Sequence, residues 1–428
     1  MSGSDRARRS PLTAPTVVAA LAFAALAGCA TFAPNVDGMY AAGPGAARAP
    51  EGAVPSLVLI GDIGVPRGEA TERLAQRVAG ALANAPGAPV VVLGDVFYIA
   101  GLQGTCPSTP GVSMFGCQDE AGPPEDQLEG VLGPYRAALG DNPVIAIGGN
   151  HDYYGGEPAV RNQCRLIPTA GRGWRYYAKG CELTDANPVA TIDLGDVVVF
   201  AVDSEPMIRD AKFRRRTIEA LRAEIFRVRT EKPHAWRLVA THHPLETQGS
   251  HNGATGVTGA LKDIYWLRKT VLAPLFLPLE AWLGAQDPYE LRYRDYRREL
   301  YALFAQQPID AFVSGHDHDL QHLTIDHPGV GTQIVSGAGA NRSPVQRYGL
   351  DFLWLNRLGR LLGLRDVLPA PRHEMEFGLG GEIDAPDLSG YGFAVVTPDG
   401  SELVVDYVDP WRDGALYTAR VDRAPGRD

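Results

Sequence analysis

The sequence predicts an α/β fold, in which short buried strands alternate with amphipathic helices. Short apolar runs such as Leu57-Val58-Leu59-Ile60 recur along the chain, as buried strands do. Helical periodicity separates several of these runs; for example, Leu74, Val78 and Leu82 fall on one face of a helix. The composition of 45% hydrophobic and 21% charged residues is that of a globular protein and excludes a largely disordered chain. With 49 glycines and 33 prolines, a loop-rich architecture is favoured over a helical bundle.

Six apolar runs are the expected strands of the central part of the chain. They span residues 57–60, 90–93, 144–147, 197–202, 238–240 and 311–313. A second helix is expected after the fourth run, where the apolar positions Ile218, Leu221, Ile225 and Val228 repeat at helical spacing. Residues 392–406 predict a β-hairpin, because the turn sequence Pro398-Asp399-Gly400 separates two apolar stretches.

Five of the expected strands end at a polar side chain. These side chains are Asp62, Asp95, Asn150, His242 and His316. In open α/β sheets, ligands bind beyond the carboxyl ends of the strands. Glycines stand next to most of these positions and allow the backbone to turn tightly and approach a ligand. The sequence therefore predicts that the five side chains converge on one site.

The predicted site has the chemistry of a metal centre. Asp, Asn and His side chains, together with Tyr98, suit Fe, Mn or Zn ions that bind oxygen-rich substrates. The chain has neither a GxSxG nucleophile elbow at a strand–helix turn nor a GxxxxGK[ST] phosphate loop. A net charge of −10 argues against a nucleic-acid-binding protein, whereas bound metal charge still allows a phosphate ester to bind.

Five short motifs occur in a characteristic order. They are GDIG (61–64), GDVFY (94–98), GNHD (149–152), VATHH (239–243) and GHDH (315–318). From about residue 56 to residue 408 the chain resembles the calcineurin-like metallophosphoesterases, and within them it is most similar to the purple acid phosphatases. The resemblance implies a four-layer αββα sandwich with two mixed β-sheets, formed by a catalytic domain at residues 53–428.

The resemblance also implies two metal ions, Fe(III) and a divalent Fe, Zn or Mn ion. The expected ligands of the ferric ion are Asp62, Asp95, Tyr98 and His318, and those of the divalent ion are Asp95, Asn150, His242 and His316. Asp95 would bridge the two ions. His242 is preferred to His243 because it is the fourth residue of the V-x-x-H pattern, and adjacent strand residues point in different directions.

Two positions favour the purple acid phosphatase branch of the superfamily. Many phosphodiesterases of this superfamily have a histidine two residues after the first aspartate, where this chain has Gly64. Tyr98 is the ligand that purple acid phosphatases use instead. Because a free phenol has a pKa near 10, ligation by Tyr98 at neutral pH requires a strong Lewis acid such as Fe(III). The alternative for Tyr98 is a packed core tyrosine with a satisfied hydroxyl.

The expected reaction is hydrolysis of a phosphomonoester, with a metal-bound hydroxide attacking phosphorus in line. His151 and His251 are the candidate catalytic acids, because histidine titrates near neutral pH. His251 lies nine residues after His242, the offset of a second active-site histidine in mammalian-type purple acid phosphatases; it could instead be an exposed loop histidine. The alternatives are a phosphodiesterase or phospholipase-like enzyme on the same dimetal site and, more distantly, a non-catalytic envelope protein that binds metal or phosphate.

Several further polar residues lie close to the motifs. Asp152, Asp317 and Asp319 are expected either to orient the ligating imidazoles or to form loop turns. His322 is a candidate for contact with the site because it follows His318 by four residues. The other three histidines, His234, His327 and His373, are expected on the surface.

The N-terminus predicts a lipid anchor. Residues 1–28 have the basic start and short apolar core of a bacterial lipoprotein signal, which makes Cys29 the lipidated residue and residues 29–52 a flexible tether. The alternative is an ordinary secretory signal with an incidental cysteine. Because Ala30 rather than an acidic residue follows Cys29, the expected location is the cell envelope, at the outer membrane. Nothing in the sequence indicates an oligomeric state.

Four cysteines remain in the expected oxidising compartment, and an even number predicts two disulfides. Three pairings are possible, and we expect the nearest-neighbour pairing of Cys106 with Cys117 and Cys164 with Cys181.

Two segments depart from compact members of the superfamily. An insertion at about 257–300 and an apolar-basic segment at about 350–370 are expected to form a cap over the catalytic core. The alternative is contact with the membrane or with a lipid-like leaving group.

Overall fold

The computed structural model describes residues 36–37, 39–41, 54–65, 68–102, 122–249, 251, 290–343, 345–346, 373–381 and 388–424. The predicted lipidation site Cys29, the cysteines Cys106 and Cys117, residues 257–289 of the predicted insertion and the whole segment 350–370 lie outside the described residues.

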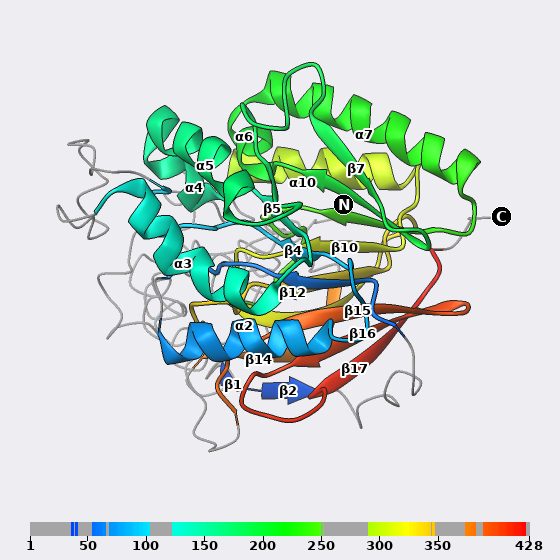
Figure 1. Cartoon of the computed structure of the whole chain (residues 1–428). Coiled ribbons are helices and arrows are strands. Elements are labelled where there is room, and N and C mark those ends of the chain that lie inside the picture. The colour runs from blue at the N-terminus through cyan, green and yellow to red at the C-terminus, as the bar shows by residue number, and fades with distance from the viewer. Residues whose placement is uncertain are drawn as a thin grey trace, which may run out of the picture.

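The first sheet has seven strands in the order β17-β16-β15-β3-β4-β5-β6 (Figure 1). Strands β3 to β6 pair in parallel, whereas β15, β16 and β17 pair antiparallel, so the sheet is mixed. Its strands are β3 (Leu57–Ile60), β4 (Val90–Val92), β5 (Val144–Ile147), β6 (Arg175–Tyr177), β15 (Phe393–Asp399), β16 (Glu402–Val408) and β17 (Tyr417–Asp422). The predicted C-terminal hairpin is therefore confirmed as β15 and β16.

The second sheet has eight strands in the order β2-β14-β11-β12-β10-β9-β8-β7. It is also mixed, with β8, β9, β10 and β12 parallel to one another and the remaining strands antiparallel. Its strands are β2 (Met39–Ala41), β7 (Val189–Asp193), β8 (Val197–Val202), β9 (Trp236–Ala240), β10 (Ala311–Ser314), β11 (Asp319–Ile325), β12 (Thr332–Ser336) and β14 (His373–Gly380).

Helices cover the outer face of each sheet, which completes four layers (Figure 1). The first sheet packs against α2 (Glu69–Ala81), α3 (Pro124–Leu139) and α5 (Gly156–Ala170), and the second against α6 (Ser204–Arg209), α7 (Ala211–Glu231) and α10 (Leu291–Phe304). A third apolar cluster lies between the two sheets. The predicted αββα sandwich with two mixed sheets is thus confirmed.

Strand β3 shows why its sequence is continuously apolar. Val58 and Ile60 pack against the helices, and Leu57 and Leu59 pack between the two sheets. All four side chains are fully buried. Because successive side chains of a strand point to opposite faces, a strand covered on both sides needs an apolar residue at every position.

Part of the predicted tether joins the folded body. Met39–Ala41 forms β2, which pairs with Leu379, Gly378 and Phe377 of β14, and Val36–Asp37 forms β1, which pairs with β13 (Val345–Gln346). The expectation of a flexible segment from 29 to 52 is wrong at these residues. An edge strand leaves backbone N–H and C=O groups unpaired, and a short added strand satisfies them without needing a strong sequence pattern.

The end of the predicted insertion belongs to the core rather than to a cap. Residues 291–300 form most of α10, and Tyr293, Tyr296 and Leu300 are fully buried against the second sheet. The tyrosine hydroxyls are satisfied by the loop after β9: Tyr293 donates to the carbonyl oxygen of Pro244 at 2.6 Å.

Cys164 on α5 forms a disulfide with Cys181, which confirms one of the two expected pairs. Among the described helices, none combines the length and apolar character needed to cross a bilayer.

Candidate metal centre

The ends of strands β3, β4, β5, β9 and β10 bring together all nine of the predicted metal ligands and catalytic histidines. Contacts between their side chains or backbone atoms link Asp62, Asp95, Tyr98, Asn150, His151, His242, His251, His316 and His318. The convergence follows from parallel pairing, which places the carboxyl ends of neighbouring strands at the same edge of a sheet.

Three of these residues have an uncommon backbone conformation. Asp62, Asp95 and His316 have φ angles of 59°, 51° and 72°, and each follows a glycine at the end of its strand. A left-handed backbone at a non-glycine residue costs on the order of 1–3 kcal/mol and persists where the surrounding structure imposes it. The conformation turns each side chain beyond the end of its strand and toward the shared site.

One cluster consists of Asp62, Tyr98 and His318. The Tyr98 hydroxyl donates to Asp62 Oδ1 at 2.8 Å and lies 3.0 Å from His318 Nε2. The distance from His318 Nε2 to Asp62 Oδ1 is 3.6 Å. One carboxylate oxygen and one imidazole nitrogen, both of types that bind iron, therefore lie next to the phenol oxygen.

Gly64 packs directly against Tyr98. A Cβ atom at position 64 would lie 2.6 Å from the Tyr98 backbone nitrogen and 2.8 Å from its ring carbon Cδ2. The backbone nitrogen of Tyr98 also donates to the carbonyl oxygen of Gly64 at 3.1 Å. The tyrosine thus occupies the space that a histidine at position 64 would need.

A second cluster consists of Asn150, His242 and His316. Asn150 Oδ1 lies 2.8 Å from His242 Nε2 and 3.2 Å from His316 Nδ1, and these two histidine nitrogens are 3.2 Å apart. All three side chains are buried. Three potential ligand atoms therefore surround one point.

Asp95 lies between the two clusters. Its Oδ1 atom is 3.5 Å from His242 Nε2, and ligand atoms of Asp62, Asp95 and His242 all lie within 4.8 Å of one another. The backbone nitrogen of His151 donates to Asp95 Oδ1 at 2.9 Å, which holds the carboxylate in place. A carboxylate in this position could be shared by both clusters.

His242 presents a lone pair to the second cluster. Its Nδ1 atom lies 2.8 Å from the carbonyl oxygen of Leu93, which can only accept a hydrogen bond, so Nδ1 carries the proton. Burial lowers the pKa of His242 and favours the neutral ring, which leaves Nε2 as an acceptor facing Asn150 Oδ1. Two acceptors at this distance fit a cation between them, and a metal ion meets that requirement.

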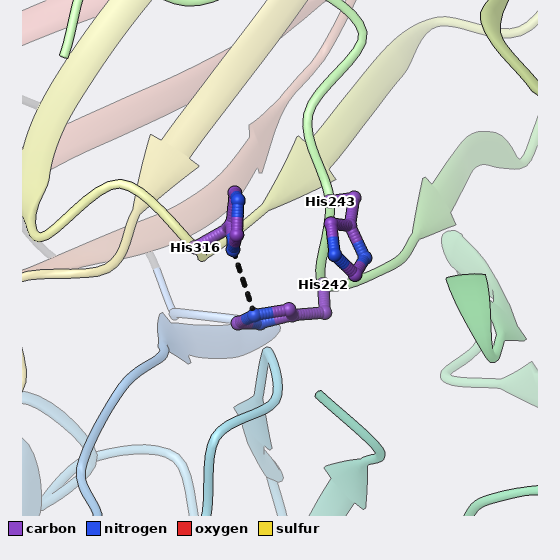
Figure 2. Close-up of side chains that lie close together, drawn as sticks. All are labelled: His242, His243 and His316. Atoms are coloured by element: carbon purple, nitrogen blue, oxygen red, sulfur yellow. Dashed lines mark hydrogen bonds between the residues drawn. The ribbon is translucent and has the colours of Figure 1, made fainter. Parts of the chain in front are cut away.

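The adjacent histidines His242 and His243 pair with different groups. In Figure 2 a hydrogen bond joins His242 to His316, and the ring of His243 lies beside both, with its centroid 4.5 Å from that of His316 and 4.9 Å from that of His242. His243 Nδ1 instead pairs with the Ser204 hydroxyl at 2.8 Å. Ligand atoms of His242, His243 and His316 nevertheless lie within 4.8 Å of one another, so His243 borders the site.

The electrostatics of the first cluster also fit a cation. Burial, followed by the nearby charge of Asp95, raises the pKa of Asp62 well above its usual value. Burial lowers the pKa of His318 to about 3, which leaves its ring neutral. Burial and Asp62 raise the pKa of Tyr98. Buried carboxylates and a phenol in contact are destabilised as anions unless positive charge is bound among them.

His151 lies at the edge of the site, between two tyrosine rings. Its ring centroid is 4.6 Å from that of Tyr98 and 4.8 Å from that of Tyr154. Nδ1 lies 2.8 Å from the carbonyl oxygen of Ile99 and therefore carries the proton in the neutral ring. Nε2 faces the site, 4.0 Å from Asp95 Oδ2, and is the atom that can exchange a proton with a substrate.

His251 stacks beside the second cluster, with its ring centroid 4.1 Å from that of His316. The loop that carries it is held by buried groups. Asp317 accepts from the backbone nitrogen of His251 at 2.8 Å and from the Thr247 hydroxyl. Gln321 accepts from the backbone nitrogen of Gln248 at 2.9 Å. These bonds therefore hold the half-buried His251 beside the second cluster, and it is not an exposed loop histidine.

The neighbouring aspartates brace loops. Asp152 accepts from the backbone nitrogens of Val96, Phe97 and Gly149, at 3.2, 3.1 and 2.9 Å. Asp319 accepts from Gln321 Nε2 at 2.7 Å. These bonds support the loop-forming alternative for the aspartates.

Two histidines differ from expectation. His322 is buried on β11, and its Nδ1 lies 3.0 Å from the hydroxyl of Tyr407 on β16, which is not one of the residues of the metal centre. His373, expected at the surface, has a side chain only 7% exposed and lies 3.3 Å from the carboxylate of Glu246. The physical reason is that Glu246 is buried and needs cationic or donor partners. His234 is exposed and His327 is half-buried against Tyr301.

Sequence reasoning missed three residues that contact the site. Asn341 hydrogen-bonds to Tyr98 and lowers its pKa against the effect of burial. Thr247 and Tyr154 hold the His251 loop and the Asn150 side chain, respectively. Only Tyr154 had a sequence signal, because it follows Asn150 by four residues, a spacing that brings side chains together on a helix.

Comparison with known proteins places the chain in a family. A family model described as calcineurin-like phosphoesterase matches residues 55–320. The site and fold described above thus define a metal-dependent hydrolase of phosphate esters, and the chain belongs to the calcineurin-like phosphoesterase family.

Individual relatives are more distant. Tartrate-resistant acid phosphatase type 5 of Oryctolagus cuniculus is 23% identical over 369 residues, which cover 84% of this chain and 89% of that protein. The Sus scrofa protein of the same name is 22% identical over 275 residues, covering 64% and 62%. Among solved structures, GAP50, described as the anchor in the inner membrane complex of Plasmodium, is 13% identical with a TM-score of 0.46, and the match covers 86% of this chain and 88% of GAP50.

Proposed function

We infer that this phosphoesterase hydrolyses phosphomonoesters with an Fe(III)–divalent metal pair, as purple acid phosphatases do. The observation that carries the proposal is the Tyr98 hydroxyl, 2.8 Å from Asp62 and 3.0 Å from His318, in space left open by Gly64. A phenol is a ligand suited to Fe(III) rather than to a weaker Lewis acid. The acid phosphatases among the relatives support the same reading.

The donor atoms divide into two ligand sets that share Asp95. Asp62, Tyr98 and His318 would hold the ferric ion, and Asn150, His242 and His316 would hold the divalent ion. When bound, such ions neutralise phosphoryl charge and make water a nucleophile near neutral pH. The protein contributes fixed positions, because the Asp95 carboxylate and the imidazole of His242 are held by backbone groups.

His151 is the proposed acid for the leaving group. The carbonyl oxygen of Ile99 holds its Nδ1 proton, so Nε2 is the atom that faces the site and can deliver a proton to an ester oxygen. His251 is the second candidate, since it stacks on His316 beside the other cluster. Substituting each in turn separates them: the pH–rate profile loses its alkaline limb, where the proton donor would be deprotonated, only when the true proton donor is removed.

The metal assignment is tested by the visible spectrum of purified protein with its iron counted. We expect an absorption band from tyrosinate bound to Fe(III), which Tyr98→Phe abolishes. Tyr153→Phe is the matched control, because the Tyr153 hydroxyl donates to Asp203 and not to the clusters. A colourless wild-type enzyme that is fully active with manganese would overturn the assignment.

Substrate preference is tested with paired phosphomonoesters and phosphodiesters that share one leaving group. We expect a higher kcat/KM for the monoester. A reversed preference would favour the phosphodiesterase or phospholipase-like alternative on the same site.

We also propose that the enzyme acts in the bacterial cell envelope, held by lipid on Cys29, on the basis of the signal sequence alone. Cys29→Ser should release the protein from the membrane fraction. Retention of this variant in the membrane fraction would argue against the anchor.

A further inference from the structure

The amide of Asn150 has a defined partner on each side. Its Nδ2 group donates to the Tyr154 hydroxyl at 2.9 Å. Its Oδ1 atom faces His242 Nε2 and His316 Nδ1 at 2.8 and 3.2 Å. The nitrogen end of the amide therefore points to Tyr154, and the oxygen end points to the second cluster.

This orientation matters because the two ends of an amide have opposite chemistry. Oδ1 carries lone pairs and can bind a cation, whereas Nδ2 carries two hydrogens and would repel one. With a 180° rotation about the terminal bond, the N–H groups would face the lone pair of His242. In the productive rotamer the half-buried Tyr154 hydroxyl accepts from Nδ2, and this hydrogen bond stabilises that rotamer.

Helix α4 (Asn150–Tyr154) supplies that partner. Tyr154 follows Asn150 by four residues, so the two side chains lie on the same face of the helix. The Tyr154 ring also packs 4.8 Å from the ring of His151, which fixes the aromatic side chain independently of its hydroxyl. Burial raises the pKa of Tyr154 above its usual value, so the hydroxyl keeps its proton and remains a neutral partner for the amide.

We propose that Tyr154 is a positioning residue: its hydroxyl fixes the Asn150 amide with Oδ1 toward the divalent metal site and thereby sets the affinity of that site. The proposal rests on the proposed two-metal function. It extends that function, because it assigns the orientation of the ligand Asn150 to a residue that is not itself a ligand.

The test is Tyr154→Phe, which removes the hydroxyl and keeps the ring that packs on His151. After the divalent ion has been removed with a chelator, Zn²⁺ is titrated into the protein in competition with a chromophoric chelator. We expect the Zn²⁺ dissociation constant to rise by about 10-fold, at the lower end of the 10–100-fold typical of residues that orient metal ligands. The matched control, Tyr153→Phe, should leave the dissociation constant unchanged.

A double-substitution cycle separates an effect on the Asn150 amide from a general loss of stability in Tyr154→Phe. In an Asn150→Ala background there is no amide to orient, so Tyr154→Phe should produce no further loss of Zn²⁺ affinity. Equal losses in both backgrounds, an unchanged affinity in Tyr154→Phe, or an equal loss in Tyr153→Phe would each overturn the proposal. A wild-type protein that binds no Zn²⁺ at all would instead overturn the proposed function.

Discussion

Gly64 packs so closely against Tyr98 that no side chain fits at position 64. A Cβ on Gly64 would lie 2.6 Å from the Tyr98 backbone nitrogen, which is closer than non-bonded atoms approach. The absence of a histidine at position 64 and the presence of Tyr98 in the second motif are therefore linked by packing. In this arrangement the Tyr98 hydroxyl reaches Asp62 Oδ1, at 2.8 Å.

Gly64→Ala tests this relationship. The added methyl must displace backbone atoms of Tyr98, and we expect a loss of about 1–3 kcal/mol of stability, typical of overpacking, together with reduced metal content. Thermal unfolding and metal analysis measure the two effects. Gly80→Ala in α2 is the control, because a Cβ there meets nothing within 4 Å. If both variants behave like wild type, the packing argument fails.

Thr247→Val tests how the His251 loop is held. The Thr247 hydroxyl donates to Asp317 and accepts from the backbone nitrogen of Gly249 at 3.0 Å and from Gln321 Nε2 at 3.1 Å. Removing it should lower stability by about 1–3 kcal/mol. If His251 acts in catalysis, kcat should fall by about 10-fold, a part of what a positioned acid contributes.

The control for Thr247→Val is Thr324→Val on the exposed side of β11, which should change neither stability nor kcat appreciably. The effect on kcat should vanish in a His251→Ala background, since the loop then has no catalytic side chain to place. Additive losses in the double variant would contradict the assignment.

The Cys164–Cys181 disulfide should contribute substantially to stability. The bond joins residues separated by 17 positions and ties α5 to the segment after β6. Closing a loop of about 15 residues is worth roughly 3 kcal/mol in the chain-entropy account. Replacing both cysteines with serine should lower Tm under non-reducing conditions. The difference from wild type should shrink when wild type is reduced first; equal Tm values without reductant would show that the bond does not form.

Glu246 should make stability depend on pH in the acid range. The carboxylate is buried, which raises its pKa, but ion pairing with Arg297 and a hydrogen bond from His373 outweigh burial and lower the pKa to about 2. A group whose pKa is lower in the folded than in the unfolded state contributes stability above its unfolded pKa of about 4.5. That contribution, about 3 kcal/mol, is lost as pH falls toward 2.

Urea unfolding of wild type and Glu246→Gln at several pH values measures this contribution. The wild-type free energy of unfolding should fall between about pH 4.5 and pH 2 by more than that of Glu246→Gln. Glu157→Gln on the exposed side of α5 is the control and should retain the wild-type pH dependence. Parallel pH curves for wild type and Glu246→Gln would refute the prediction.

The strands and the site residues were predictable because they depend on local pattern. Runs such as Val90–Val92 and Val144–Ile147 are apolar at every position, which is typical of a strand covered on both faces. Each run leads directly into a polar motif residue, and parallel pairing then brings Asp95 and Asn150 together. Strand β2 and the core position of α10 were not predictable, because their stability comes from partners distant in the sequence.

By itself, the sequence identified the side chains that the fold brings together, because their types and their order along the chain form the five motifs. Only the tertiary structure decided how each side chain is oriented: the proton of His242 on Nδ1, the amide oxygen of Asn150 toward the histidines, and the loop of His251 on Asp317. These orientations depend on hydrogen-bond partners that the fold brings from other elements. A residue's own identity does not specify which of its atoms faces the site.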